Sequence, residues 1–347
     1  MTTSAPKKGT PLVRVREYGV LGLLALIWGA SFLFIKIGVL AVSPATLVEL
    51  RLLFSVVTLL LVVACQPSLF AGWRRFWKLS LAVGVINYVI PYLLIAWGET
   101  RISSGMASIL NATTPLFTVL LANWWAAVGY EALTVRRGLG VVVGFLGVGV
   151  LVGPGLFDLG GGQHPDLAGL IAVLIAAAAY AVGALLSRGY AGSAQLVGPL
   201  GSQLAALIVT LPIALLWSPP THLPSWLALG AIAELGVLGT GIAYLLYFWL
   251  INHVGATRTM VVTYLLPCTA LIWGVALLGE TVTWYALVGL AFVLVGTLIT
   301  NGTLTGLFTR RRKGSRGRIA PAALAVPAET VVSEAAELSD TSPLRTQ

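Results

Sequence analysis

The chain has 347 residues, of which 58% are hydrophobic and only 10% are charged, whereas an average soluble domain is roughly 25% charged. A soluble fold of this length cannot bury so much apolar surface in its core, so the composition requires lipid as the solvent. The net charge of +9 does not indicate a nucleic-acid partner, because a run of basic residues (310–318) follows the last apolar segment. Runs of this kind beside a membrane span set topology and contact anionic lipids.

A helix that crosses a membrane needs about 20 mostly apolar residues. The polar segment 153–166 divides the apolar part of the chain into two halves. We therefore expect an all-α integral membrane protein with a tail (1–17), a five-helix repeat (18–157), a linker (158–167), a second five-helix repeat (168–303) and a basic, then disordered tail (304–347). The ten expected transmembrane helices cover residues 18–40, 45–65, 79–98, 104–126, 136–157, 168–188, 195–217, 226–250, 256–279 and 283–303.

The two halves resemble each other in sequence. YLLIAW (92–97) recurs as YLLYFW (244–249), 152 residues later, and Pro115 recurs as Pro267 at the same offset. After a slip of three residues, EALT (131–134) recurs as ETVT (280–283). This ordered series indicates an internal duplication. Because each half has an odd number of helices, the second half must enter the membrane from the opposite side, which gives the inverted repeat of many secondary transporters.

The basic residues predict the orientation. With a cytoplasmic N-terminus, 18 of the 21 lysine and arginine residues fall in segments on the inside, and only Arg101 lies in an outside loop. This distribution follows the positive-inside rule. We therefore expect a multi-pass protein of the plasma or inner membrane, with both termini in the cytoplasm and the 153–166 linker outside.

Three stretches of the sequence resemble the EamA family of the drug/metabolite transporter superfamily: WGASFLFIKIG (28–38), the segment 44–51, and the long stretch 238–296. The last stretch follows the family's repeat pattern, with a YLLYF-like helix, a helix with a central proline, a Gly-Glu pair and a glycine-spaced closing helix. The resemblance covers roughly residues 18–302. It implies ten helices around a central cavity and the movement of small metabolites or drugs without ATP. It does not imply a particular substrate.

Two prolines give the first candidates for the substrate cavity. Pro115 and Pro267 fall near the middle of their expected helices, and paired interruptions in the two halves point to a transporter site. Two packing kinks would give the same pattern. Ser104, Ser108 and Asn111 share a helix face with Pro115, and that face must point inward, either into a cavity or against a neighbouring helix.

Ionisable residues inside spans are functional candidates. Arg51 matches an arginine common at this place in the family, and it either faces the cavity mouth or holds its helix to its neighbours. Glu234 is the most deeply placed carboxylate of the second half, so it is our first candidate for proton coupling, with Glu49 as the second. A polar cavity residue without coupling is the alternative reading. Lys36 is expected to extend towards the membrane surface.

Aromatic residues complete the set of candidates. Trp28, Tyr92, Tyr244 and Tyr264 either offer rings and hydroxyls to a substrate or pack in the ordinary way. Two conspicuous carboxylates, Glu131 and Glu280, each precede a threonine by three residues. We expect both to be structural, interacting with the starts of their own closing helices.

The sequence contains no phosphate-binding loop of the G-x-x-x-x-G-K-[ST] type, and His164, His222 and His253 lack metal-ligand spacing. Cys65 and Cys268 lie in apolar segments and are expected to be packing residues. We expect no cofactor, no metal and no catalytic residues. The predicted function is a secondary transporter, an exporter of a small metabolite or drug by alternating access, with a small-molecule substrate and the bilayer as partners. A membrane-embedded enzyme and a passive channel are the alternatives, and a homodimer is left open.

Overall fold

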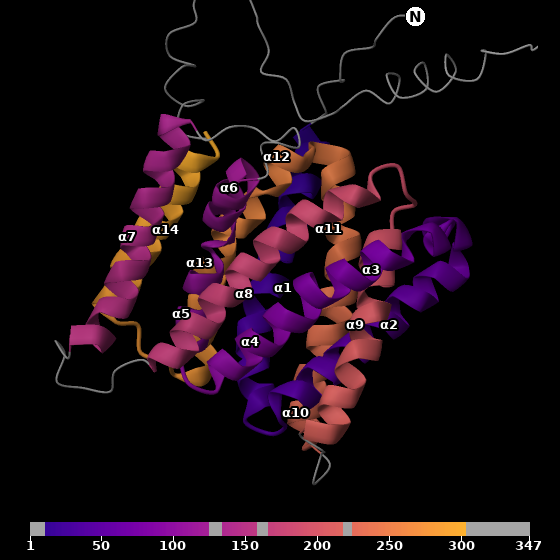
Figure 1. Cartoon of the computed structure of the whole chain (residues 1–347), viewed down its shortest axis with the longest axis horizontal. Helices are drawn as coiled ribbons and strands as arrows, with labels where there is room; N and C mark the ends of the chain where they lie inside the picture. Colours follow the sequence, from indigo (N-terminus) through magenta and orange to yellow (C-terminus); the bar gives the residue numbers. More distant parts are fainter. Residues whose placement is uncertain (1–10, 125–133, 158–165, 218–223, 303–347) are drawn as a thin grey trace, which may run out of the picture. The chain divides into compact units, whose positions relative to one another are not determined.

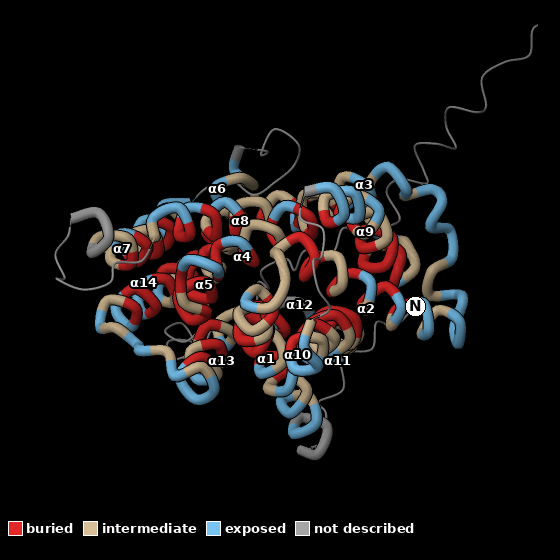
Figure 2. Tube along the Cα trace, turned by 90° about the horizontal axis from the view of Figure 1, so that it is seen from below, coloured by how far each residue is buried: buried red, intermediate tan, exposed pale blue. Residues whose placement is uncertain are grey.

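A computed structural model of the chain describes residues 11–124, 134–157, 166–217 and 224–302. In these ranges all regular structure is helical. Nine helical stretches in them are long and apolar enough to cross a membrane, and one further apolar helix, Trp284–Thr300, is shorter. Many large apolar side chains are exposed, and the buried stretches of the helices lie on the inside of the bundle (Figure 2). The chain is therefore a multi-pass membrane protein.

The first half begins with a helix that starts earlier than the predicted residue 18. The start of the second helix follows local rules, because Ser43 accepts a hydrogen bond from the Thr46 N–H and Pro44 occupies the first turn. The helices are α1 (Pro11–Val39), α2 (Pro44–Cys65), α3 (Trp77–Gly84), α4 (Ile90–Glu99), α5 (Ser104–Asn111), α6 (Thr114–Trp124) and α7 (Val135–Phe157).

The second half starts at α8, which Asp166 caps, and its α10 is capped by Ser225. Its helices are α8 (Leu167–Leu186), α9 (Val197–Trp217), α10 (Trp226–Gly236), α11 (Ala243–Val254), α12 (Ala256–Thr259), α13 (Val261–Leu278) and α14 (Trp284–Thr300).

The two halves make reciprocal contacts (Figure 1). α1 packs against α13 and against α10 and α11, while α8 packs against α5 and α6 and against α3 and α4. α2 contacts α9, and α7 lies along α14. These main contacts between the halves thus occur in matching sets, as expected for two similar units packed against each other.

A π-helical segment interrupts the same helix in each half. η3 (Val85–Val89) joins α3 to α4, and η6 (Val237–Ile242) joins α10 to α11. Val85 and Val237 are 152 residues apart, which is the offset of the sequence repeat. In η6, the Thr240 hydroxyl donates to the carbonyl of Leu235 at 2.7 Å. π-Helical turns of this kind are frequent at functional sites.

The prediction of paired breaks at the two prolines is wrong for the second half. The helix expected over 104–126 divides into α5 and α6 just before Pro115, but α13 continues through Pro267. Thr114 donates to the carbonyl of Asn111 at 2.7 Å, and this is the carbonyl that the missing N–H of Pro115 cannot reach. The residues just before Pro267 (Leu265, Leu266) are apolar and offer no hydroxyl that could compete with the helix.

α7 and α14 approach each other closely through glycines (Figure 1). A Cβ atom added at Gly296 would lie 2.4 Å from the Gly144 nitrogen and 2.5 Å from the Gly140 oxygen. One added at Gly147 would lie 2.7 Å from the Gly289 oxygen. The two backbones are therefore in contact along this pair, as in other small-residue interfaces between membrane helices.

Candidate functional site

Side chains from both halves meet beside the two π segments. Most of them are aromatic or polar, and they come from α2, η3, α4, α8, α9, α10, η6 and α11. We call this group the central cluster, and it consists of Arg51, Tyr88, Tyr92, Tyr180, Gln203, Glu234, Thr240 and Tyr244.

Arg51 is the cation of the central cluster. Its side chain is buried, its Nε donates to the Thr240 hydroxyl at 3.0 Å, and its guanidinium lies 3.9 Å from the centre of the Tyr92 ring. Glu234 is within electrostatic range of Arg51. The cluster thus combines a cation from the first half with a carboxyl group from the second, against an aromatic face that favours the cation.

Tyrosines connect the two halves. The Tyr88 hydroxyl donates to the Tyr244 hydroxyl at 2.8 Å, and the Tyr88 ring meets Tyr92 edge-on at a centroid distance of 5.6 Å. Tyr180 packs edge-on against Tyr92 at 6.5 Å. Tyr92 and Tyr244 were predicted from the sequence, but Tyr88 and Tyr180 were not. The repeat offset could have found Tyr88, because it is 152 residues from Thr240.

Two buried polar atoms of the central cluster have no hydrogen-bond partner, the Nε2 of Gln203 and the Oε2 of Glu234. Gln203 lies beside Tyr88, and its Oε1 accepts from Ser55 at 2.5 Å. A buried polar atom without a partner carries a desolvation cost of about 1–3 kcal/mol. A donor and an acceptor in this condition within one cluster are what a polar ligand or ordered water would satisfy.

A glycine allows close packing next to Glu234. A Cβ atom added at Gly239 would lie 2.9 Å from the Ser31 Oγ and 3.9 Å from the Glu234 Oε2. Ser31 is on α1 and was not predicted as a site residue. The absence of a side chain at Gly239 therefore lets Ser31 of α1 and the carboxyl group of Glu234 pack closely against the backbone of η6.

The other predicted cavity residues lie apart from these contacts. Trp28 packs against Tyr247 at 5.6 Å, on the face where α1 meets α11. Ser108 is buried and donates to the Gly105 carbonyl of its own helix at 2.6 Å. Asn111 ends α5 with an Oδ1 atom that is buried without a partner.

The remaining predictions also fall on packing positions. The Tyr264 hydroxyl accepts from Asn301 at 2.6 Å, where α14 ends. Pro115 is in the first turn of α6, and Pro267 is inside α13. Glu49 accepts from the Thr210 hydroxyl at 2.5 Å, on the side of α2 that faces α9.

The expectation that Glu280 interacts with the start of its own closing helix is wrong. Its carboxylate accepts instead from Ser104 and Gly105 at the start of α5, in the opposite half. Packing brings the α13–α14 connection over this helix start, a relation that sequence spacing cannot show. Glu131, its counterpart in the repeat, lies outside the described residues.

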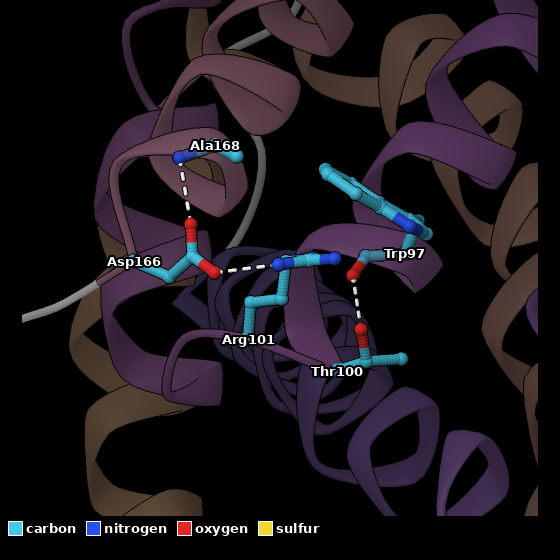
Figure 3. A network of polar contacts seen from close by, with 5 residues as sticks. All are labelled: Trp97, Thr100, Arg101, Asp166 and Ala168. Carbon is cyan, nitrogen blue, oxygen red and sulfur yellow. Dashed lines mark hydrogen bonds and ion pairs between the residues drawn. The ribbon is translucent and has the colours of Figure 1, made fainter.

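A surface ion pair also joins the two halves (Figure 3). Arg101, in the α4–α5 connection, lies 2.6 Å from the Asp166 Oδ2, and the other oxygen of Asp166 accepts from the Ala168 N–H at 2.8 Å. The guanidinium also lies 4.3 Å from the centre of the Trp97 ring. The hydrogen bond from Arg101 holds the pKa of Asp166 below its usual value.

No group of three or more His, Cys, Asp or Glu side chains in the described ranges could hold a metal ion. The arrangement offers charged and aromatic contacts for a small polar molecule between helices, which is the usual chemistry of a binding site for transport.

The chain is similar to several transporters over nearly the whole length of each of them. An "Uncharacterized transporter" of Archaeoglobus fulgidus is 25% identical over 295 residues, covering 82% of this chain and 98% of the relative. The "Uncharacterized inner membrane transporter YedA" of Escherichia coli K12 is 26% identical over 290 residues, with 82% and 90% covered. A "Probable amino-acid metabolite efflux pump" of Salmonella typhimurium is 25% identical, with 82% and 94% covered.

A solved structure titled "Crystal structure of protein" has a similar fold, with a TM-score of 0.59, 18% identity, and 86% of this chain and 99% of that chain covered. The model of the EamA-like transporter family matches the chain twice, over residues 18–153 and 166–302. The two matches contain the two sets of helices that contact each other reciprocally. The chain is therefore a membrane transporter that belongs to the EamA-like transporter family.

Proposed function

We propose that this transporter is a secondary, ATP-independent exporter of a small metabolite, which it moves by alternating access. The observation that carries the proposal is the central cluster, where a buried cation and a carboxyl group from opposite halves lie among tyrosines. The unpartnered Gln203 Nε2 and Glu234 Oε2 atoms give this cluster unmet polar contacts. Such a site between two halves can be exposed to either side of the membrane in turn.

The same proposal includes ten spans in two inverted repeats. The reciprocal helix contacts and the equivalent π segments support it. α14 is the shortest candidate span with 17 residues, and at 1.5 Å per residue it is about 26 Å long. This is close to the hydrocarbon thickness of about 30 Å, and α14 runs along α7, its counterpart in the first half.

The charges of the central cluster favour a zwitterionic substrate, such as a free amino acid. Among the described residues, the hydrogen bond of the Arg51 guanidinium is the one from its Nε to Thr240, so the planar fork of Nη groups is available to a carboxylate. Glu234 could accept from an ammonium group, and the tyrosines could contact the substrate's side chain. The name of the Salmonella relative, an amino-acid metabolite efflux pump, agrees with this class.

Glu234 is the first candidate for proton coupling within this site. Its carboxyl group is next to Arg51, and one of its oxygens has no partner. Glu49 is the second candidate, but it is engaged by Thr210 on α9. Because Glu234 belongs to the central cluster and Glu49 does not, we rank Glu234 first.

Counterflow into proteoliposomes tests the proposal. Vesicles loaded with an unlabelled neutral amino acid should take up the labelled amino acid in a saturable way. The matched amine, which lacks the carboxylate, and the matched acid, which lacks the ammonium, should exchange poorly. Equal and non-saturable flux of all three compounds would indicate a passive channel and would contradict the proposal. An absence of exchange for every zwitterion and every other metabolite tested would also contradict the proposal.

A further inference from the structure

A second group of charged side chains lies at the end of the bundle where α1 and α4 end and α5 begins. We call it the end cluster, and it consists of Lys36, Glu99 and Glu280. The fields of Lys36, Glu280 and Arg51 all act on the carboxyl group of Glu99. The end cluster includes one residue, Glu99, that sequence reasoning placed at a helix boundary and left aside.

Lys36 binds the backbone where α4 ends. Its Nζ donates to the backbone carbonyls of Glu99 at 2.6 Å and of Ile102 at 3.0 Å. The last carbonyls of a helix lack partners within the helix and form the negative end of its dipole. The carbonyl of Glu99, at the end of α4, and that of Ile102, in the α4–α5 connection, therefore hold the ammonium group against the protein.

The carboxyl oxygens of Glu280 both have hydrogen-bond donors. It accepts from the N–H and the hydroxyl of Ser104, at 2.8 and 2.9 Å, and from the N–H of Gly105, at 3.1 Å. The start of a helix favours a negative charge, because its first N–H groups are free and its dipole is positive there. Glu280 therefore ties the α13–α14 connection to α5 of the other half.

Glu99 is in the opposite condition. Its side chain is 0% exposed, and neither of its carboxyl oxygens has a hydrogen-bond partner. An ionised carboxylate buried in this way carries a far larger desolvation cost than the neutral acid. Lys36 acts on this carboxyl group electrostatically, but its ammonium group already donates to two backbone carbonyls.

The charge balance of the neighbourhood also favours a neutral Glu99. Two cations, the half-buried Lys36 and the buried Arg51, share this neighbourhood with three carboxyl groups (Glu99, Glu234 and Glu280). On the neighbouring elements, α5 has no titratable side chain, Tyr180 of α8 is a neutral phenol, and Arg101 and Asp166 compensate each other at the surface. Glu280 already accepts three hydrogen bonds at the start of α5, and Arg51 also acts on Glu234, so a negative charge on Glu99 would have no counterion of its own.

We propose that the carboxyl group of Glu99 is a proton-binding site that keeps its proton while the end cluster is closed and releases it when this end of the bundle opens to water. On opening, water solvates the carboxylate and the Lys36 ammonium pairs with it, so release is favourable. The closing movement reverses these steps and rebinds one proton. This inference rests on the proposed alternating access, since it assigns the proton movement to one end of the cycle.

Infrared spectroscopy of the full-length protein in lipid tests the site without any transport measurement. The carbonyl stretch of a protonated carboxyl group is separate from that of a carboxylate. We expect wild-type protein at neutral pH to show this band, and the Glu99→Gln variant to lose it. Glu17→Gln, at a half-buried position near the start of α1, is the matched control and should keep the band.

Further variants exclude other sources of the band. Glu49→Gln should leave it in place, and Glu234→Gln should not remove the component that Glu99→Gln removes. A band that survives in Glu99→Gln, or its absence from the wild type, would overturn the proposal. Two variants guard against misfolding of Glu99→Gln. Glu99→Asp should keep the band but shift its frequency. In Lys36→Met, which lacks the cation, the band should disappear at a higher pH than in the wild type.

The result can be separated from the proposed function. A wild type that shows the Glu99 band but exchanges no metabolite would contradict transport while leaving the proton site in place. A wild type that exchanges amino acids but lacks the band would contradict the proton site and leave the proposed transport in place.

Discussion

The two halves of the molecule place different side chains at equivalent positions of one scaffold. Arg51 on α2 and Gln203 on α9 are 152 residues apart, the offset of the repeat. Arg51 bonds Thr240 in η6, whereas Gln203 lies beside Tyr88 in η3, and these two partners are again 152 residues apart. The geometry of the contact is shared, but only the first half supplies a cation. Duplication thus explains why equivalent positions contact each other, and sequence divergence explains why only one of the two positions carries a charge.

The α7–α14 pair differs from the centre in this respect. Gly140 and Gly289 share a repeat position, as do Gly147 and Gly296, and each lies against the backbone of the partner helix. Both halves kept glycine where backbones touch, because any Cβ atom would collide there. They diverged in the centre, where side chains face one another. The close backbone packing of α7 and α14 therefore lies apart from the charged and aromatic residues of the central cluster.

The largest expected effect comes from removing the charge that only the second half contributes to the centre. Glu234→Gln keeps the shape and polarity of the side chain but cannot bind or release a proton. We expect it to abolish proton-driven accumulation of substrate in proteoliposomes, whereas counterflow exchange should persist at a higher substrate concentration, because the contact to the substrate's ammonium group is weakened. Accumulation at the wild-type level would exclude Glu234 as the coupling group and would turn attention to Glu49.

Making the first half resemble the second should have the next largest effect. Arg51→Gln removes a charge-assisted contact to a substrate carboxylate of about 1.5–3 kcal/mol, which corresponds to roughly a 10- to 100-fold weaker Kd. Gln203→Ala, at the equivalent position, removes a neutral contact of about 1 kcal/mol and should weaken binding roughly fivefold. Equal effects in the two variants, measured by binding of the exchanged amino acid, would remove the asymmetry on which this account depends.

The glycine contacts allow a matched test of packing. Gly296→Ala places a methyl group against the Gly144 backbone, whereas Gly149 on α7 has nothing within 4 Å of an added Cβ atom. Overpacking typically costs about 1–3 kcal/mol. Thermal unfolding in detergent should therefore show a lower Tm for Gly296→Ala and an unchanged or slightly raised Tm for Gly149→Ala. Similar Tm values for both variants would show that α7 and α14 are not in close contact.

The smallest expected effect concerns the surface pair of Arg101 and Asp166. The pKa of Asp166 is lowered in the folded protein, so the pair stabilises the fold above the ordinary aspartate pKa of about 4 and is lost as the pH falls through the lowered value. Both side chains are well exposed, so the gain is small. We expect the Tm difference between wild type and Asp166→Asn to shrink on acidification. A difference that stays constant in acid would assign it to the α8 cap rather than to the ion pair.

Much of the fold could be predicted from the sequence because lipid imposes simple rules on it. Hydropathy placed the apolar helices, and the recurrence of YLLIAW as YLLYFW marked the helices that contain the two π segments. The different outcomes at Pro115 and Pro267 could not be read from the prolines themselves. They depend on whether nearby hydroxyls, such as that of Thr114, satisfy the released carbonyls.

The candidate site was only partly predictable. Arg51, Tyr92, Glu234 and Tyr244 meet in the central cluster, but Tyr264 and Ser108 bond elsewhere. Depth along a helix can be counted from the sequence, whereas the direction in which a side chain points relative to the other half cannot. Glu99 was missed for the same reason, since a position at a helix end gave no sign that packing buries it completely.

The most direct test of the central claim, that a site between the halves opens to each side of the membrane in turn, is thiol labelling of Ser31→Cys. Cys65 and Cys268 are free thiols and would first be replaced by serine and alanine. A membrane-impermeant reagent should label the Ser31→Cys variant from either side of sealed vesicles, and the exchanged amino acid should protect it. Ser108→Cys, buried in α5, should remain unlabelled from both sides. Labelling of the Ser31→Cys variant from one side only, or labelling that substrate does not slow, would contradict alternating access at this site.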